Sequence, residues 1–241
     1  MPPPPPRLTD RFFAAGAFAN EVHGGHRRLG TQIPYSAHLM IVAGLVLEDG
    51  GDETQAIAAL LHDAVEDGGG RPMLERIRAE FGTEVAAIVD ACSDSLDPGD
   101  TRSWRERKTA YLARLPDITD QATLRVALAD KVHNARSIVR DYRAEGHALW
   151  ERFTNKTIDD QLWYYRASLD FFSTRHPGPL VEDLRRALAE LEALAARDAP
   201  ARPAATPSAN AASRTSKSAP LASRASSSNG PPSVGGRRGP D

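Results

Sequence analysis

The residues most suited to chemistry lie in one short run of ionisable side chains. The stretch 58–67 reads AALLHDAVED and passes from small apolar residues directly into one imidazole and three carboxylates. If a single helix continues to Asp67, His62 and Glu66 share a face, and Asp63 and Asp67 form the neighbouring stripe. So many charges do not pack together in a core without a cation or bound water. This helix edge is therefore either solvated or a metal site.

Further potential metal ligands occur on two other predicted helices. His38 lies early in the second predicted helix, and Asp130 lies in a long helix predicted over residues 121–142. If these helices pack beside the central one, four ligands could meet at one point: His38, His62, Asp63 and Asp130. Two nitrogens and two oxygens suit Mn²⁺, Fe²⁺, Co²⁺ or Zn²⁺, and without a thiolate nothing favours a structural zinc site.

Each of these residues also has a plain structural interpretation. His38 alone could be a structural histidine, and Asp130 with Lys131 could form an exposed ion pair. Glu66 and Asp67 could be a solvated last turn of the helix, which the glycines at 68–70 end. Carboxylates at that end oppose the helix dipole unless a cation compensates, and this favours the functional interpretation.

The elements that must position these residues all show helical spacing of apolar side chains. The predicted helices are one capped by Thr9 or Asp10, one opening at 34–36, the central one capped by Asp52, one over 72–81, one restarting at 82–84, and segments 104–115, 121–142, 150–172 and 179–196. No run of five or more residues alternates convincingly between apolar and polar, so the predicted fold class is all-α.

Composition indicates three regions. Residues 1–7 are a proline-rich lead that we expect to be disordered, 8–196 form the helical domain, and 197–241 are an Ala/Ser/Pro/Arg-rich tail with few large apolar residues, also expected to be disordered. This tail is mildly basic. We favour the interpretation that it is simply solvated, and the alternative is a weak contact with nucleic acid or another protein.

Charge and cysteine content limit the partners and the compartment. The 241 residues carry a net charge of −2, so nothing points to nucleic acid or an anionic membrane as a partner. No apolar run approaches the ~20 residues of a membrane span. The single cysteine, Cys92, is expected to be buried and inert, and no secretory signal is visible. We therefore expect a cytoplasmic protein, and the oligomeric state is left open.

Several motifs between residues 10 and 150 occur in a fixed order. They are His23-x-Gly25-x-x-Arg28, Pro34-Tyr35-x-x-His38, Ala59 to Asp67, Phe81-Gly82-x-x-Val85-Ala86, and Leu128 to Asn134 followed by Arg136. In order and spacing they resemble the HD-domain hydrolases, and within these the hydrolase part of the RelA/SpoT alarmone enzymes and the small stand-alone alarmone hydrolases. The resemblance implies an HD-domain helical bundle.

The resemblance also implies a reaction, namely the Mn²⁺-dependent removal of the 3′-pyrophosphate from ppGpp or pppGpp. By position it implies that the metal ligands are His38, His62, Asp63 and Asp130. It implies that Glu66 and Asp67 position and deprotonate the attacking water. It further implies that four residues face the nucleotide: Arg28, Tyr35, Lys131 and Asn134.

This chain departs from the family pattern at three places. His26 stands where the pattern has Gln, Leu39 stands where it has Pro, and Ser93-Asp94-Ser95 replaces a Thr-Asp or Thr-Lys segment. None of these is an implied metal ligand, but they leave the exact substrate open. One alternative is therefore an HD phosphohydrolase of another nucleotide or phosphoester. Another is a non-catalytic nucleotide sensor, although a sensor is expected to have lost part of the ligand set or the Glu66-Asp67 pair.

Overall fold

Helices account for the regular structure of the part of the chain that is described, residues 7–97, 99–153 and 157–198 of a computed structural model. In chain order they are α1 (Asp10–His23), α2 (Tyr35–Glu48), α3 (Glu53–Leu61), α4 (Ala64–Asp67), α5 (Arg71–Cys92), α6 (Trp104–Arg114), the 3₁₀ turn η1 (Leu115–Asp117), α7 (Gln121–Glu145), the 3₁₀ turn η2 (Gly146–Arg152), α8 (Ile158–Arg175) and α9 (Pro179–Asp198). No strand occurs in these ranges, and Arg27 and Pro34 form an isolated bridge. The all-α prediction is confirmed.

Side-chain caps explain where several of these helices begin. The Thr9 side chain accepts a hydrogen bond from the backbone N–H of Arg11, and Asp52 accepts one from Gln55 at 2.9 Å. At the start of α6, Ser103 and Glu106 form a reciprocal capping box. Each cap pairs a backbone donor that the first helical turn leaves free.

The central helix is shorter than the sequence suggested. It ends at Leu61, and after His62 and Asp63 a separate single turn, α4, carries Glu66 and Asp67. The condition for the shared face of His62 and Glu66, a single helix to Asp67, is therefore not met. His62 and Asp63 lie between the two helical segments.

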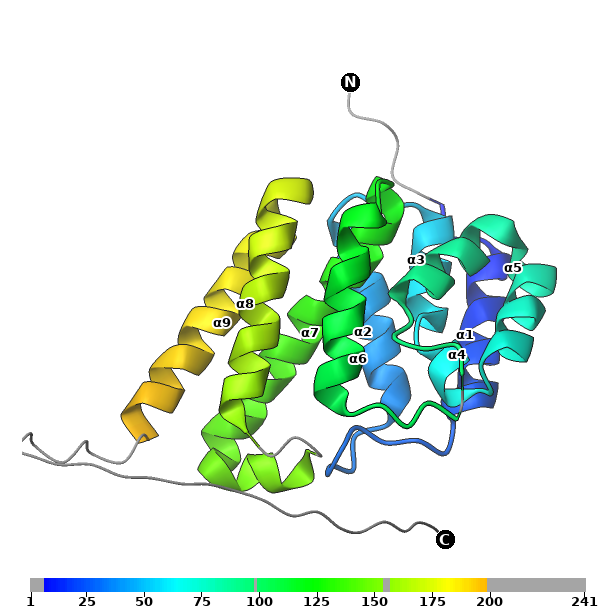
Figure 1. Ribbon diagram of the computed structural model, residues 1–241. Helices are drawn as coiled ribbons and strands as arrows, with labels where there is room; N and C mark the ends of the chain where they lie inside the picture. Colours follow the sequence, from blue (N-terminus) through cyan, green and yellow to red (C-terminus); the bar gives the residue numbers. More distant parts are fainter. Residues whose placement is uncertain (1–6, 98, 154–156, 199–241) are drawn as a thin grey trace, which may run out of the picture. The chain divides into compact units, whose positions relative to one another are not determined.

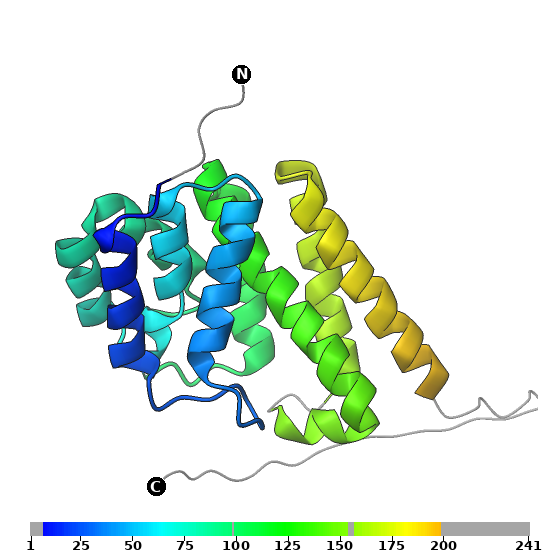
Figure 2. The ribbon, with the colours of Figure 1, turned by 180° about the vertical axis from the view of Figure 1, so that it is seen from behind.

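Helices α2, α3 and α7 pack against one another at the centre of the domain (Figures 1 and 2). The 25-residue α7 buries its apolar stripe as predicted, with Leu128, Val132 and Val139 all within the core. On the other side of α3, helices α1 and α5 close the bundle, and the rings of Phe18 and Phe81 meet edge to face. The three central helices are therefore held from both sides and can position ligands rigidly.

Helix α5 contains a sharp kink at Gly82. This residue has φ 90° and ψ 167°, a backbone conformation that is essentially restricted to glycine. The kink falls where the sequence predicted that one helix stops and another restarts.

The last two helices cover α7. Helix α9 packs on both α7 and α8 and buries a seam of leucines: Leu180, Leu184, Leu188, Leu191 and Leu194. The segment 150–172 is mostly helical, as expected, with η2 ending at Arg152 and α8 beginning at Ile158. Helix α6 packs on α8, which brings both helices beside the central trio.

The described residues belong to one compact unit within 1–200. Residues 1–6 of the predicted lead (1–7) and residues 199–241 of the predicted tail (197–241) lie outside the described residues, so the three-part division stays a prediction. Arg197 and Asp198, the first two residues of the predicted tail, belong to α9 instead. Among the described helices, none combines the length and apolar character needed to cross a bilayer.

Candidate metal and phosphate site

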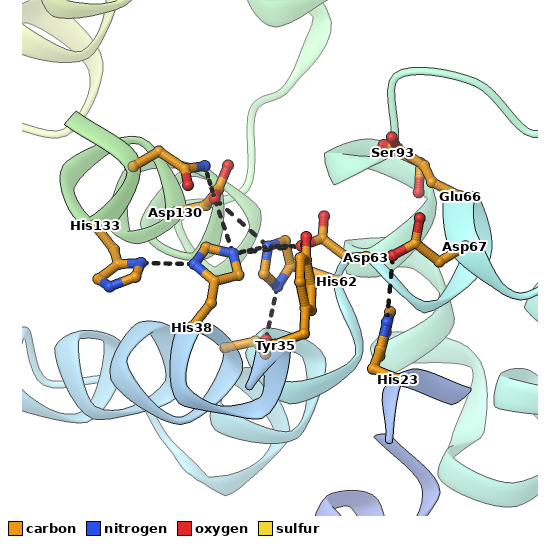
Figure 3. Close-up of polar contacts among 12 residues, drawn as sticks. His23, Tyr35, His38, His62, Asp63, Glu66, Asp67, Ser93, Asp130 and His133 are labelled. Atoms are coloured by element: carbon orange, nitrogen blue, oxygen red, sulfur yellow. Dashed lines mark hydrogen bonds and ion pairs between the residues drawn. The ribbon is translucent and has the colours of Figure 1, made fainter. Parts of the chain in front are cut away.

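Two imidazoles and two carboxylates meet where α2, the end of α3 and α7 come together (Figure 3). His38 Nε2 and His62 Nε2 lie 3.2 Å apart. Asp63 Oδ2 lies 3.3 Å from the first and 3.1 Å from the second. Asp130 Oδ1 lies 3.4 and 3.5 Å from the same two nitrogens. The structure thus brings together all four residues predicted as metal ligands.

These spacings fit a first-row divalent ion. With metal–ligand bonds of about 2.1 Å, neighbouring donor atoms are expected about 3.0 Å apart in octahedral and about 3.4 Å apart in tetrahedral geometry. The five distances given above run from 3.1 to 3.5 Å. Acceptor atoms this close repel one another unless a proton or a cation lies between them. The donor set therefore suits a divalent metal.

Hydrogen bonds on the far side of each imidazole turn its Nε2 toward the cluster. His62 Nδ1 lies 2.8 Å from the carbonyl oxygen of Ala59, which can only accept, so Nδ1 carries the proton. His38 Nδ1 lies 2.6 Å from His133 Nδ1, and the Nε2 of His133 is 3.5 Å from Ser137 Oγ. Such outer partners set the tautomer and ring orientation of metal-binding histidines. When Nε2 is unprotonated in both rings, these partners direct the two Nε2 lone pairs toward the cluster.

Burial and the neighbouring charges act against each other on the pKa values of this cluster. Burial lowers the pKa of His38 and also disfavours charge on His62, but the carboxylates of Asp63 and Asp130 outweigh burial and hold the pKa of His62 well above its usual value. Burial would raise the pKa of Asp63, yet the His62 imidazole keeps it well below the usual range. For Asp130 the same result comes mainly from Lys131. Both carboxylates are therefore ionised at neutral pH, as ligands must be.

Neighbouring side chains donate hydrogen bonds to both carboxylates of the cluster. The Tyr35 hydroxyl donates to Asp63 Oδ2 at 2.7 Å. Lys131 Nζ donates to Asp130 Oδ2 at 2.8 Å, and the Asn134 amide donates to Asp130 Oδ1 at 2.5 Å. Three of the residues predicted to face a nucleotide thus also orient the carboxylates of the cluster.

Glu66 and Asp67, the predicted catalytic pair, point in different directions (Figure 3). Glu66 Oε1 accepts a hydrogen bond from the backbone N–H of Asp94 at 2.7 Å. Loss of water around its carboxylate, together with the charges of Asp94 and Asp63, raises the pKa of Glu66 to about 7. Asp67 Oδ2 lies 3.3 Å from His23 Nδ1 instead. Glu66 and Asp67 are adjacent on α4, so their side chains project about 100° apart.

A cavity of about 290 Å³ opens beside the cluster, and the four predicted nucleotide-facing residues line it, together with Asp130. Arg28 reaches it from the loop before α2 and donates to Asn134 Oδ1 at 2.6 Å. Aromatic side chains from other elements complete the wall, among them Trp104, Phe153, Tyr164 and Tyr165. The cavity therefore combines cations next to the cluster with flat apolar surfaces.

Sequence reasoning missed some of these contributors. His133 is the partner of His38. Lys108 lines the cavity and pairs with Asp94. Tyr164 and Tyr165 are buried and also line the cavity. Only His133 lies within one of the sequence motifs, the one from Leu128 to Asn134.

With the site described, comparison with known proteins identifies the family. Residues 15–157 match the model of the HD domain, and the chain belongs to that family. The His62-Asp63 pair and its partners His38 and Asp130 all fall within the matched range.

Two curated relatives share the same region. A protein of Synechocystis sp. named "Probable guanosine-3′,5′-bis(diphosphate) 3′-pyrophosphohydrolase" is 36% identical over 126 residues, which are 52% of this chain and 16% of that protein. A protein of Mycobacterium leprae named "Probable GTP pyrophosphokinase" is 38% identical over 105 residues, 44% of this chain and 13% of that protein. This chain therefore spans only a small part of the length of these relatives.

A solved structure shows the same fold. It is described as a metazoan ortholog of SpoT that hydrolyses ppGpp, and it superposes with a TM-score of 0.60 over 76% of this chain and 97% of that chain. Sequence identity between the two is 22%, so this likeness supports the fold alone.

Proposed function

We propose that this protein is a metal-dependent phosphohydrolase that removes the 3′-pyrophosphate of guanosine 3′,5′-bis(diphosphate). The observation that carries the proposal is the meeting of His38, His62, Asp63 and Asp130 at metal-ligand spacing beside a cavity lined with cations and aromatic rings. The substrate is the one named for the Synechocystis relative, which is 36% identical over 126 residues.

The four clustered residues would hold the metal. A divalent ion held there would lower the pKa of bound water and screen phosphate charge. A site with equal numbers of imidazole and carboxylate ligands accepts Mn²⁺, Fe²⁺, Co²⁺ or Zn²⁺, and we propose Mn²⁺ because carboxylate ligands suit it.

The chain's own cations would bind the phosphates. Arg28 and Lys131 lie next to the cluster, and Lys108 reaches the same cavity from α6. Their charge offsets the negative charge of the pyrophosphate and of the transferring phosphoryl group. The rings of Trp104 and Tyr165 offer flat surfaces against which a purine base can stack.

Glu66 is the residue that we assign as the general base. With a pKa of about 7 it is ionised in part of the molecules at neutral pH and still basic enough to accept a proton from water. The hydrogen bond from the Asp94 N–H holds the carboxylate in place. The water oxygen then bonds to the phosphorus attached to the ribose 3′ oxygen. The P–O3′ bond breaks, the 3′ oxygen is protonated, and the products are GDP and pyrophosphate.

Asp67 fits proton transfer less well. Its Oδ2 is engaged by the imidazoles of His23 and His26. We therefore assign proton transfer to Glu66 alone.

The test is hydrolysis of ppGpp by purified protein, with and without Mn²⁺, followed by release of pyrophosphate. The wild type should convert ppGpp to GDP and pyrophosphate only with the metal. Glu66→Gln keeps the shape of the side chain but removes the base, so the rate should fall on the order of 10²–10⁴-fold while metal and nucleotide binding persist. His62→Ala should lose the metal and the activity together.

Other outcomes identify the alternatives. Tight binding of ppGpp without pyrophosphate release under any divalent metal would indicate a nucleotide sensor. Hydrolysis of another nucleotide in a panel, with ppGpp untouched, would leave the metal site in place and overturn the substrate. A Glu66→Gln variant with wild-type turnover would show that Glu66 is not the base.

A further inference from the structure

A second group of potential metal ligands lies beside the first. Among the described residues, His23, His26 and Asp67 offer one ligand atom each, and these atoms all lie within 4.8 Å of one another. The Tyr35 ring separates this group from the first, because it stacks on His23 at 5.0 Å and meets His38 edge to face at 5.5 Å. The two groups are therefore distinct and share no residue.

The spacing of the second group matches that of the first. His23 Nδ1 lies 3.3 Å and His26 Nδ1 lies 3.7 Å from Asp67 Oδ2, and the two nitrogens are 3.4 Å apart. Donor atoms around a first-row divalent ion are expected about 3.0–3.4 Å apart, so a small movement of the exposed His26 ring completes the geometry. Two imidazoles and one carboxylate on one side of an ion leave the remaining positions to solvent.

Each ligand is held by contacts that do not need a metal. The His23 side chain is fully buried at the end of α1 and stacked on Tyr35. The backbone N–H of His26 donates to the carbonyl of His23 at 2.8 Å, and the carbonyl of His26 accepts from the backbone N–H of Tyr35 at 3.1 Å. Asp67 is fixed at the end of α4 by a bond from its backbone N–H to the carbonyl of Asp63. The site is therefore largely preformed.

Two imidazole nitrogens converge on one carboxylate oxygen and on each other, an arrangement that a simple ion pair does not require. Neutral imidazole is the form that metals bind. The His26 and Asp67 side chains are 45% and 39% exposed, so an ion can enter from solvent.

We propose that His23, His26 and Asp67 form a second divalent-metal site. Its two nitrogens and single oxygen favour Zn²⁺, Co²⁺ or Ni²⁺ over Mn²⁺, in contrast with the more oxygen-rich first site. This second site is independent of the proposed hydrolysis. It requires His26, which stands where the related family pattern has Gln.

The experiment is to count zinc ions bound to the full chain. Metal-stripped protein is dialysed against a series of free Zn²⁺ concentrations, and the zinc bound per chain is measured by elemental mass spectrometry. The wild type should bind about two ions per chain, and His26→Gln about one, since Gln removes one nitrogen ligand without changing the loop. Asp130→Asn should also bind about one, and the double variant none. His147→Gln removes an exposed imidazole outside both groups and should retain both ions.

A second measurement places the ion. In the Asp130→Asn protein, Zn²⁺ should shift the imidazole signals of His23 and His26 in ¹H–¹⁵N spectra, and the His26→Gln change should abolish the shift at His23. A His26→Gln protein that binds as many ions as the wild type, or an Asp130→Asn protein that binds none, would overturn the proposal. Loss of one ion in the Asp130→Asn protein reports on the first site, and loss of one ion in the His26→Gln protein reports on the second. The two sites are therefore tested separately.

Discussion

The two central histidines each use one nitrogen for the cluster and the other for the protein. His62 is fixed by the backbone carbonyl of Ala59, whereas His38 is fixed by another side chain, His133. Burial and the nearby His38 lower the pKa of His133 to about 3, so it stays neutral and can accept the Nδ1 proton of His38. The orientation of one metal ligand thus depends on a residue that would not touch the metal.

We predict that His133→Phe weakens metal binding. The phenyl ring retains most of the volume but cannot accept the proton of His38 Nδ1, so His38 loses its fixed tautomer. Affinity for Mn²⁺ should fall roughly 10–100-fold, the usual effect of losing such a partner. Titration calorimetry measures it. Ser137→Ala is the control, because it leaves the contact between the two Nδ1 atoms in place, and its affinity should stay close to that of the wild type.

The raised pKa of Glu66 gives a pH prediction. The carboxylate is the active form of a base, so kcat/KM should rise with pH and level off above a midpoint at or below about 7, since a cation bound near Asp63 lowers the pKa further. In the metal-free protein the folded state holds this proton more tightly than the unfolded chain, so stability should fall as pH rises from about 4.5 to about 7.

The Glu66→Gln variant tests both effects. The kcat/KM of its residual activity should no longer rise with pH near neutrality. Its free energy of unfolding, measured with urea, should lack the decrease between about pH 4.5 and about pH 7 that Glu66 causes in the wild type. A wild-type profile that is flat between pH 5 and pH 8 would contradict the assignment of Glu66 as the base.

At the scale of elements, two interruptions divide the helices. After the interruption that follows Leu61, the short α4 carries Glu66, which accepts a hydrogen bond from the Asp94 N–H, and Asp67, which lies beside His23. The second interruption is the kink at Gly82 in α5, a helix that packs on both α3 and α7.

We predict that Gly82→Ala destabilises the fold. An added Cβ would meet only Arg11 Nη2 at 3.9 Å, so the cost is conformational and not steric. At φ 90° an alanine should cost about 1–3 kcal/mol of the free energy of unfolding. Gly16→Ala is the matched control. Gly16 lies inside α1 with nothing within 4 Å of an added Cβ, so alanine there should be neutral or stabilising. Equal urea midpoints for the two variants would contradict the role of the kink.

At the scale of the whole molecule, the helical unit has its own continuous core, to which α1 through α9 contribute. Helix α9 seals α7 and α8 with a seam of leucines. The cytoplasmic location, the oligomeric state and the disorder of both ends, by contrast, stay predictions from composition.

We predict that deleting residues 199–241 leaves the helical unit unchanged. This segment is rich in Ala, Ser, Pro, Arg and Gly and offers few large apolar side chains to bury. The helical circular-dichroism signal and the melting temperature should stay close to those of the full chain. A melting temperature lowered by many degrees would show that the segment packs on the domain.

The sequence by itself determined the all-α class, several helix caps and the four residues that meet in the cluster, His38, His62, Asp63 and Asp130. These features depend on short-range spacing and on residue types with few chemical roles, such as His62 followed by Asp63 after an apolar face.

Only the tertiary structure decided what the side chains near the cluster do. His38 meets His133 across 95 positions of the chain, and Arg28 meets Asn134 across 106. The break after Leu61 and the direction of Glu66 also follow from packing between distant helices. Such pairings cannot be predicted from local periodicity, because periodicity relates only residues three or four positions apart.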